Sequence, residues 1–415
     1  MSETLTLAST SSVRACLPAL EIIHAATLAP SADNNQPWLF SVENNRLLVF
    51  ADHSRALSSD VEGMFDWMSL GAAMENACIA SRHFGWQPIV TYPAKGDAVT
   101  SSTSPAAAID FERGGRPDPL FAWLEQRCTC RRAYSRRPLE DPLLARLARA
   151  AAEVSPEIQV DWAADRSQLR KLAMFIAAGD RIRLEHRPFH AELYRQLRLT
   201  EAEVQRTRDG LDVRTLELPP GGAMLLRALR SWRRTKALNR LGLSRLLSLT
   251  SAAAVWRSGA VGALSVRQAT PAAFLEAGRA LERLWLTSAA VGLALQPLGS
   301  LPIFLRHSQR DSSRTTTTPS MGLSQEHHRR VSRLAGGLSA TLPAIGDRVL
   351  VMLFRLGYAP SPRWRSLRRP ASDVLPRHES GSQFGNGRIS DGRMEEVTDD
   401  MFGQVKQLSH EALHP

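Results

Sequence analysis

Two arginines on either side of a threonine are the strongest candidates for an anion-binding site. Arg127, Thr129 and Arg131 stand at alternate positions in the sequence Arg-Cys-Thr-Cys-Arg-Arg. A guanidinium is planar, stays charged and forms paired hydrogen bonds with phosphate oxygens, and a threonine hydroxyl between two such groups adds a donor. The spacing favours a phosphate-binding turn, and a solvated basic surface is the alternative.

A second candidate is the segment from Ala29 to Trp38, which reads APSADNNQPW. Its small residues, amide side chains and two prolines predict a rigid loop with several hydrogen-bond donors and little bulk. Such a loop is suited to lie against a flat ligand, although a turn that merely ends a helix has the same composition.

Two later segments carry related chemistry. The turn Gln296–Ser300 contains Gly299, and backbone amides at such a turn can donate hydrogen bonds to a ring nitrogen. The run Arg363–Pro370 contains four arginines, which would complete a phosphate cage.

The sequence does not support several other kinds of chemistry. It contains no G-x-G-x-x-G, Walker, G-x-S-x-G or H-E-x-x-H motif. Cys128 and Cys130 have no second Cys or His pair at ligand spacing, so they do not predict a zinc site. Four cysteines cannot crosslink a chain of 415 residues, and we expect reduced thiols. A bound metal and a hydrolase are therefore not expected.

Composition indicates a folded protein without a membrane-spanning segment. The chain is 43% hydrophobic, and its formal charge is +11. Only four of the 52 basic residues are lysines, which favours codon bias over a nucleic-acid-binding surface. The uncharged stretch from Leu284 to Leu305 contains Pro297 and Pro302, which would break a spanning helix, so we expect a buried helix followed by a loop. A cytoplasmic protein with neither membrane nor nucleic-acid partners is expected.

The elements that must position these residues form two series. The first series is predicted to contain a helix over 17–28, a hairpin over 38–42 and 47–51, a helix over 67–84, a strand over 88–92 and a linker over 93–118. The second is predicted to contain a helix over 141–154, a strand over 158–162, helices from 167 through 250, a strand over 260–266, a helix over 271–291 and a strand over 348–356. The polar segments 306–330 and 371–415 are expected to be mobile.

An internal repeat links the two series. Residues 71–85 read GAAMENACIASRHFG and residues 278–292 read GRALERLWLTSAAVG, so two glycines and a glutamate recur 207 positions apart. Any two buried helices share some apolar spacing, but this coincidence favours a duplication. The second copy is longer by about 90 residues, which predicts a helical appendage, such as a lid, at about 180–250.

Together these segments resemble the nitroreductase family of flavoproteins, which bind FMN non-covalently in a homodimer. The family pattern A-P-S-x-x-N-x-Q-P-W is matched at Ala29, Pro30, Ser31, Asn34, Gln36, Pro37 and Trp38. The family pattern R-x-S/T-x-R is matched at Arg127, Thr129 and Arg131.

The two motifs lie in different copies. Copy one (12–105) has only Thr10–Arg14 where the arginine motif should stand, and copy two (121–370) has no A-P-S loop between 150 and 162. In the family's dimers, one subunit's arginine motif holds each flavin and the partner's loop covers it. The chain is therefore similar to the Acg-type branch, which joins two such halves in one polypeptide and has a lid over the flavin.

The resemblance implies the fold and the role of each matched residue. It implies an α+β fold of nitroreductase-like three-layer α/β/α sandwiches, two copies of which form a pseudo-dimer within a monomer, with a helical lid insertion and a mobile tail at 371–415. One set of residues would bind the FMN phosphate: Arg127, Cys128 through its backbone, Thr129, Arg131, Arg368 and Arg369. A second set would cover the flavin or donate amides near its N5 and O4: Pro30, Ser31, Ala32, Asn34, Leu298 and Gly299.

The implied activity follows from the cofactor. FMN takes a hydride at N5 from NADH or NADPH and passes it to a small-molecule acceptor, which the resemblance implies to be a nitroaromatic or a quinone. No catalytic side chain is required. The alternative is a protein on the same fold that sequesters FMN beneath the lid without turnover, and other flavin chemistry also remains open.

Overall fold

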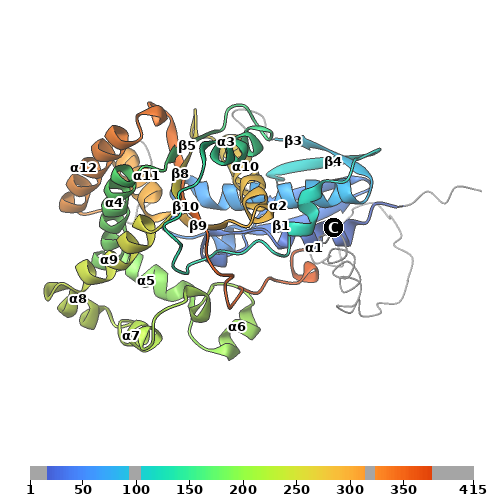
Figure 1. Ribbon diagram of the computed structural model, residues 1–415. Coiled ribbons are helices and arrows are strands. Elements are labelled where there is room, and N and C mark those ends of the chain that lie inside the picture. The colour runs from blue at the N-terminus through green and yellow to red at the C-terminus, as the bar shows by residue number, and fades with distance from the viewer. Residues whose placement is uncertain (1–15, 93–103, 314–322, 376–415) are drawn as a thin grey trace, which may run out of the picture. The chain divides into compact units, whose positions relative to one another are not determined.

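The first half of the chain forms a four-stranded antiparallel sheet with a long helix. The computed structural model describes residues 16–92, 104–313 and 323–375, and Figure 1 shows their helices and strands. The strands lie in the order β1-β2-β4-β3. The elements of this half are α1 (Ala19–Thr27), η1 (Ala32–Asn34), β1 (Trp38–Glu43), β2 (Arg46–Ala51), η2 (His53–Arg55), η3 (Val61–Gly63), α2 (Met64–His83), β3 (Trp86–Thr91), β4 (Ala107–Arg113) and η4 (Pro119–Trp123).

The second half repeats this topology. Its strands lie in the order β5-β8-β10-β9, and every neighbouring pair is antiparallel. In both sheets the first, second, fourth and third strands along the chain therefore lie side by side, and the long helix follows the second strand. The elements are α3 (Asp141–Ala152), β5 (Gln159–Ala163), β8 (Ala260–Val266), α10 (Pro271–Ala290), β9 (Ala294–Leu298) and β10 (Val349–Gly357).

The two long helices, α2 and α10, pack directly on each other through the repeated glycines (Figure 1). A Cβ atom on Gly71 would lie 2.0 Å from the carbonyl oxygen of Leu275, and one on Gly278 would lie 1.9 Å from that of Met68. Met68 and Leu275 are themselves 207 positions apart. The contact is thus reciprocal, as in a two-fold interface, and only glycine permits so close an approach.

A proline occupies the same edge position in each sheet. Pro88 lies in β3 and Pro297 in β9, and each of these strands has a neighbour on one side only. Proline lacks the N–H that a central strand must donate on both sides, so an edge strand is where it is tolerated. The Gln-Pro pairs that follow the two repeat helices in the sequence thus mark corresponding edges.

Two helical insertions distinguish the second half. In the first half Asn44 and Asn45 alone join β1 to β2, whereas the β5-to-β8 connection and the β9-to-β10 connection are both long. The first insertion contains α4 (Arg166–Glu185), α5 (Arg187–Gln196), β6 (Leu197–Arg198), α6 (Glu201–Thr207), β7 (Leu211–Asp212), η5 (Val213–Leu216), α7 (Gly222–Ala228), α8 (Trp232–Arg240) and α9 (Leu243–Trp256). The second contains α11 (Ser300–Ser313), α12 (Gln325–Thr341) and η6 (Pro343–Ile345), and η7 (Ala371–Asp373) follows β10.

The predicted helices and strands are confirmed, but two segments that were expected to be irregular contain regular elements. The linker expected over 93–118 contains β4, whose apolar residues pair with both β2 and β3. The mobile segment expected over 306–330 is helical at both ends, in α11 and α12. Helix α12 has an apolar side on which Val331, Leu334 and Leu338 are buried, and this packing stabilises the helix. Its first turns are polar, so the start of the helix gave no sign of that apolar side in the sequence. Most of 371–415 lies outside the described residues.

The uncharged stretch from Leu284 to Leu305 is not one continuous helix. It is divided among the end of α10, the strand β9 and the first turns of α11, so the expected loop is in fact a strand and a helix. Over the residues described, no helix combines the length and apolar character needed to cross a bilayer. All four cysteines are free thiols.

Candidate functional site

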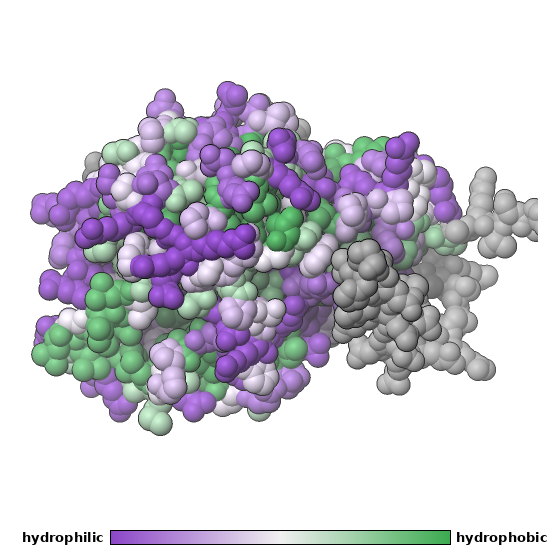
Figure 2. Space-filling model, in the orientation of Figure 1, coloured by the Kyte–Doolittle hydropathy of each residue, from purple (hydrophilic) through white to green (hydrophobic). Residues whose placement is uncertain are grey.

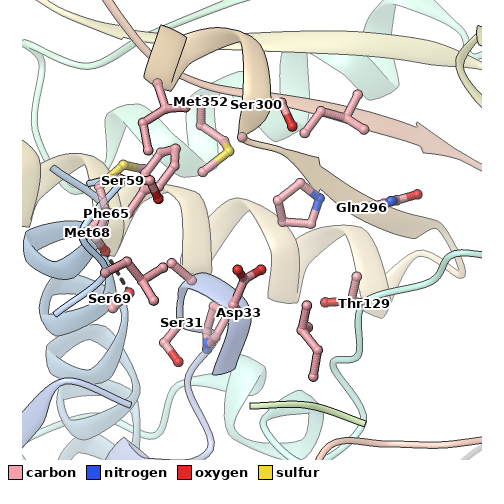
Figure 3. Close-up of a pocket in the computed structure, with 18 of the residues that line it drawn as sticks. Ser31, Asp33, Ser59, Phe65, Met68, Ser69, Thr129, Gln296, Ser300 and Met352 are labelled. Carbon is pink, nitrogen blue, oxygen red and sulfur yellow. Dashed lines mark hydrogen bonds between the residues drawn. The ribbon is translucent and has the colours of Figure 1, made fainter. Parts of the chain in front are cut away.

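A cavity of about 420 Å³ lies where both halves and the first insertion meet. Three segments that the sequence singled out line it together: Pro30, Ser31 and Ala32; Thr129 and Arg131; and Leu298 and Gly299. Figure 3 shows Ser31 and Asp33 on the η1 turn, with Thr129 and Gln296 across the same space. The remaining lining residues are mostly apolar, among them Leu57, Phe65, Met68, Ala72, Phe189, Leu193, Leu197, Leu211, Leu216, Leu226, Leu281, Trp285, Pro297, Ile303, Phe304 and Met352.

The loop between α1 and β1 holds an unusual backbone conformation at the cavity. Asp33, Asn34 and Gln36 have φ values of 48°, 58° and 52°, in the left-handed region that side chains other than glycine rarely adopt. Such strain persists only where surrounding contacts enforce it, and it is concentrated at ligand sites. Ser31 supplies one of these contacts, since its Oγ accepts a hydrogen bond from the Gln36 amide at 3.0 Å.

Amide side chains of this loop bind the insertion and the segment after β10. The Asn34 Nδ2 lies 3.2 Å from the carbonyl oxygens of both Gly210 and Leu367. The Gln36 Nε2 donates to the carbonyl of Arg208 at 2.8 Å. Asn34, which the resemblance implied to cover the flavin, does not line the cavity. Its side chain instead connects the 29–38 loop to the first insertion and to the segment after β10.

Two arginines, Arg131 and Arg183, line the cavity. Arg183 forms an ion pair with Asp33, whereas Arg131 has no carboxylate within ion-pair distance among the described residues. Its Nη1 donates to the carbonyl of Thr215 in the insertion at 3.2 Å. Burial lowers the pKa of its guanidinium, although nearby Asp33 opposes the shift. Arginine stays protonated in proteins, so a desolvated guanidinium here favours an anion. Thr129 lies close by on the same lining, which brings two of the predicted phosphate ligands together.

Arg127 lies behind the cavity wall. Its guanidinium stacks on Trp285, 4.7 Å from the ring centroid, and its Nη2 donates to the carbonyl of Leu28 at 2.8 Å. Its Nε lies 2.9 Å from a carboxylate oxygen of buried Glu282, in an ion pair that lacks hydrogen-bond geometry. Burial raises the pKa of Glu282 to about 7, and the charge of Arg127 opposes that rise. The predicted first phosphate ligand is therefore paired with a carboxylate.

The other predicted ligands also lie outside the lining. Arg368 donates to Asn34 Oδ1 at 2.9 Å and to the carbonyl of Ala29 at 3.2 Å. The backbone amide of Arg369 donates to Gln36 Oε1 at 2.8 Å. These two arginines therefore connect the 29–38 loop to the segment after β10. Cys128 is partly exposed and does not line the cavity.

Arg355, which the sequence analysis did not single out, is a buried arginine that supports the cavity wall through its hydrogen bonds. It is fully buried in β10, stacks 3.9 Å above the Tyr134 ring and has no carboxylate partner among the described residues. It donates instead to Gln296 Oε1 at 2.7 Å and to the carbonyls of Cys130, Arg132 and Ala254. Gln296 lines the cavity, and Cys130 and Arg132 are the neighbours of Arg131, which also lines it. Through these hydrogen bonds Arg355 positions two walls of the cavity. Its strand is wholly apolar otherwise, so a lone arginine there was the available signal.

The insertion contributes charge as well as apolar surface. Arg183 of α4 forms an ion pair with Asp33 at 2.9 Å, and both residues line the cavity, as does Asp180. The pair ties the insertion to the strained loop. The sequence predicted helices over this stretch, and the structure has helices there, but the sequence gave no signal for which of their residues face the cavity.

The turn after β9 leads directly into a helix at the cavity. Leu298, Gly299 and Ser300 line the cavity, and α11 begins at Ser300. The first N–H groups of a helix have no partner within it, and the helix dipole places partial positive charge there. This end of the cavity therefore favours an electron-rich group. Within 16–92, 104–313 and 323–375, no cluster of three or more His, Cys, Asp or Glu side chains is arranged to hold a metal.

No protein-family model matches the chain. An uncharacterized protein, MT1398, of Mycobacterium tuberculosis (strain CDC 1551 / Oshkosh) is 26% identical over 363 residues, which are 85% of this chain and 47% of that protein. The chain thus spans about half the length of the curated relative it matches.

Solved structures similar to this chain include nitroreductases. The FMN-dependent nitroreductase NfnB from Mycobacterium smegmatis, in complex with NADPH, is 15% identical, with 64% of this chain and 96% of that chain covered and a TM-score of 0.34. A nitroreductase with bound FMN from Bacteroides fragilis NCTC 9343 is 9% identical, with 65% and 100% covered and a TM-score of 0.32. Similarity at this level assigns no activity, so the activity has to follow from the cavity itself.

The cavity has the features that FMN requires, with fewer cations than the sequence predicted. Its volume is within the range of small-molecule sites, about 300–1,000 Å³, and its apolar walls suit a flat aromatic ring system. Arg131 and Thr129 offer lining donors that suit a phosphate group. Arg127, Arg368 and Arg369 are engaged elsewhere.

Proposed function

We propose that the chain is an FMN-dependent oxidoreductase of nitroreductase type that binds one flavin in the cavity between its two halves. One observation carries the proposal. Three segments separated by roughly 100 and 170 residues meet on the lining of one mostly apolar cavity, and two of them match flavin-binding patterns.

The chain's own residues would bind and orient the cofactor. The chemistry that a bound FMN would supply is hydride transfer from NADH or NADPH to an electron-poor acceptor such as a nitroaromatic or a quinone. Arg131 and Thr129 would bind the phosphate, while Pro30 and Trp285 on the lining would hold the ring and exclude water. The amides at Gly299 and the first turn of α11 would stabilise negative charge on a group bound at this end of the cavity.

We also propose that the two halves derive from a duplicated, self-pairing ancestor, as in the Acg-type branch. The shared strand order and the reciprocal contacts of Gly71 and Gly278 support this. The counterpart of the arginine motif in the first half would fall within residues 1–15, outside the described residues. The second half has no A-P-S loop, so a second flavin cavity related to the first by the duplication would lack the loop that covers the flavin. We therefore expect one flavin site per chain. We also expect a monomer, because both halves of the family's dimer lie in one chain.

Purification of the full chain with FMN tests the proposal. We expect a yellow protein with about one FMN per chain, and anaerobic addition of NADH or NADPH should bleach the flavin absorbance. Reoxidation by a quinone or a nitroaromatic would then establish the acceptor class.

Each other outcome has a defined meaning. Bound flavin that stays oxidised with both nicotinamides would favour sequestration beneath the insertion. Two flavins per chain would refute the single divided site, and absence of flavin binding at any FMN concentration tested would refute the proposal as a whole.

A further inference from the structure

Helices α7, α8 and α9 expose large apolar side chains among basic ones. Met224 is 76% exposed, Leu241 85% and Leu246 65%. Figure 2 shows hydrophobic side chains gathered over the part of the surface that α7 and α8 form in Figure 1, with hydrophilic ones around them. Further exposed apolar residues of these helices and the turn before them are Leu218, Leu225, Leu238, Leu249 and Trp256.

The same helices carry most of the protein's excess positive charge. Residues 218–275 contain nine basic residues and no acidic residue, so they contribute nine units to the formal charge of +11. Eight of the nine are exposed on α7–α9 or directly beside them: Arg227, Arg230, Arg233, Arg234, Lys236, Arg240, Arg245 and Arg257. We call these residues and the exposed apolar ones the basic–apolar face.

No carboxylate of the described residues lies within ion-pair distance of these eight side chains, in contrast to arginines elsewhere. Arg198 pairs with Asp209 at 2.6 Å, and Arg330 pairs with Glu185 at 2.7 Å. The fold therefore neutralises many of its arginines with nearby acids and leaves this face without compensation. An uncompensated cluster of like charges destabilises a protein unless an anionic partner covers it.

The inner sides of these helices fix the orientation of the face. Leu226 lines the cavity, Leu229 is buried, and buried Thr235 donates to the Leu229 carbonyl at 2.7 Å. Because those positions are anchored inside, the basic and apolar side chains on the other side of α7 and α8 are held in one layer at the surface.

We propose that the basic–apolar face docks the protein on an anionic membrane surface. An interfacial helix inserts its apolar side chains at the boundary of headgroups and acyl chains, while its arginines and lysines bind anionic headgroups. Nucleic acid would pair with the cations but would leave the aliphatic side chains of Met224 and Leu241 unburied. A second copy of the chain would bring like charges together.

This inference is independent of the proposed flavin chemistry, and it departs from the sequence-based expectation of no membrane partner. That expectation concerned a spanning helix. The basic–apolar face would lie on the bilayer instead of crossing it.

Vesicle flotation of the full chain tests the proposal. We expect binding to phosphatidylcholine vesicles that contain a third phosphatidylglycerol, little binding to pure phosphatidylcholine, and weakening as salt rises. A basic residue near an anionic surface contributes roughly fivefold in affinity, so Arg233→Glu with Lys236→Glu on α8 should weaken binding about 25-fold or more. Leu241→Ser with Leu246→Ser should also weaken it, because the inserted apolar area is lost.

Matched controls separate docking from general charge and from misfolding. Arg146→Glu with Arg149→Glu makes the same charge change at the same spacing on α3, where both residues are also exposed. Leu20→Ser replaces an apolar side chain of α1 that is 61% exposed. Both controls should bind like the wild type, and all variants should show wild-type circular dichroism.

Four results would overturn the proposal. Equal binding to neutral and anionic vesicles would remove the electrostatic basis, and equal losses in the α3 control would remove the assignment to α7–α9. Preferential binding to single-stranded RNA in competition with the vesicles, or a dimer that buries this face in light scattering and crosslinking, would assign the face to another partner.

Discussion

The substitution Gly278→Ala is the most direct test of the contact between α2 and α10. The added methyl would lie 1.9 Å from the carbonyl oxygen of Met68, whereas a carbon-to-oxygen contact normally lies at about 3.3 Å. The obstacle is backbone, so no side chain can rotate away. The α2 and α10 backbones would have to separate by about 1.4 Å at this point.

Such a separation loosens packing along both buried helices. Overpacking a well-packed core costs about 1–3 kcal/mol, and a forced backbone shift falls at the upper end of that range. A loss of about 3 kcal/mol would lower the melting temperature by roughly 5 °C or more. Gly278 also lines the cavity, so flavin retention should fall with stability.

Gly336→Ala is the matched control, since it makes the same change in an exposed position of α12 where nothing lies within 4 Å of the added carbon. Alanine is the better helix former by about 1 kcal/mol, so this variant should be slightly more stable than the wild type. Thermal and urea unfolding of both variants would measure the opposite signs. A Gly278→Ala protein that unfolds like the wild type would refute the close approach of α2 and α10.

Three further predictions address the site. Arg131→Ala should weaken FMN binding about 10- to 100-fold in equilibrium dialysis, because a charge-assisted hydrogen bond is lost. Arg132 does not line the cavity and donates to the carbonyl of Ser361, so equal weakening in Arg132→Ala would contradict the assignment. Burial raises the pKa of Asp66 from 3.8 to about 7, so the folded state retains a proton that the unfolded chain releases, and stability should be lost as the pH rises from 3.8 toward 7. Asp66→Asn keeps an amide oxygen for the Asn35 donor and should flatten that decline in urea titrations, and an unchanged slope would refute the role of this carboxyl. Arg355→Met would remove the donor to Gln296 Oε1 and to the Arg132 carbonyl, whereas the Cys130 and Ala254 carbonyls keep the Tyr134 and Ser258 hydroxyls, so the free energy of unfolding should fall by about 2 kcal/mol or more; an unchanged melting temperature would show that these bonds are dispensable.

Local sequence signals predicted most elements of the fold because those signals act over a few residues. The hairpin over β1 and β2 follows from alternating apolar residues around Asn44-Asn45, and the end of α1 follows from Pro30. Strand β4 was missed because its alanine-rich start resembles a linker, and only pairing with β2 and β3 shows its role.

The repeat predicted that Gly71 and Gly278 matter but not what they do. Each glycine contacts a backbone about 200 residues away, and no periodicity reports on such a contact. The recurring glutamates have an equally distant explanation: buried Glu75 pairs with Arg279 and Arg283, and buried Glu282 pairs with Arg127.

For the site, motif matching predicted which segments meet, and seven of the twelve residues assigned to the cofactor line the cavity. It did less well on individual side chains. Arg127 matches the family motif, yet a carboxylate 155 positions later, invisible to local reasoning, lies against it. The cofactor roles of all twelve residues remain predictions.

The reciprocal glycine contact has a consequence for how this protein can be altered. In a homodimer built from identical subunits, every substitution appears twice, so a change that improves one side of a two-fold contact is imposed on the other. Here positions 71 and 278 belong to one polypeptide and can be varied separately. Mutagenesis libraries can therefore reshape one wall of the cavity while the opposite wall keeps its original residues.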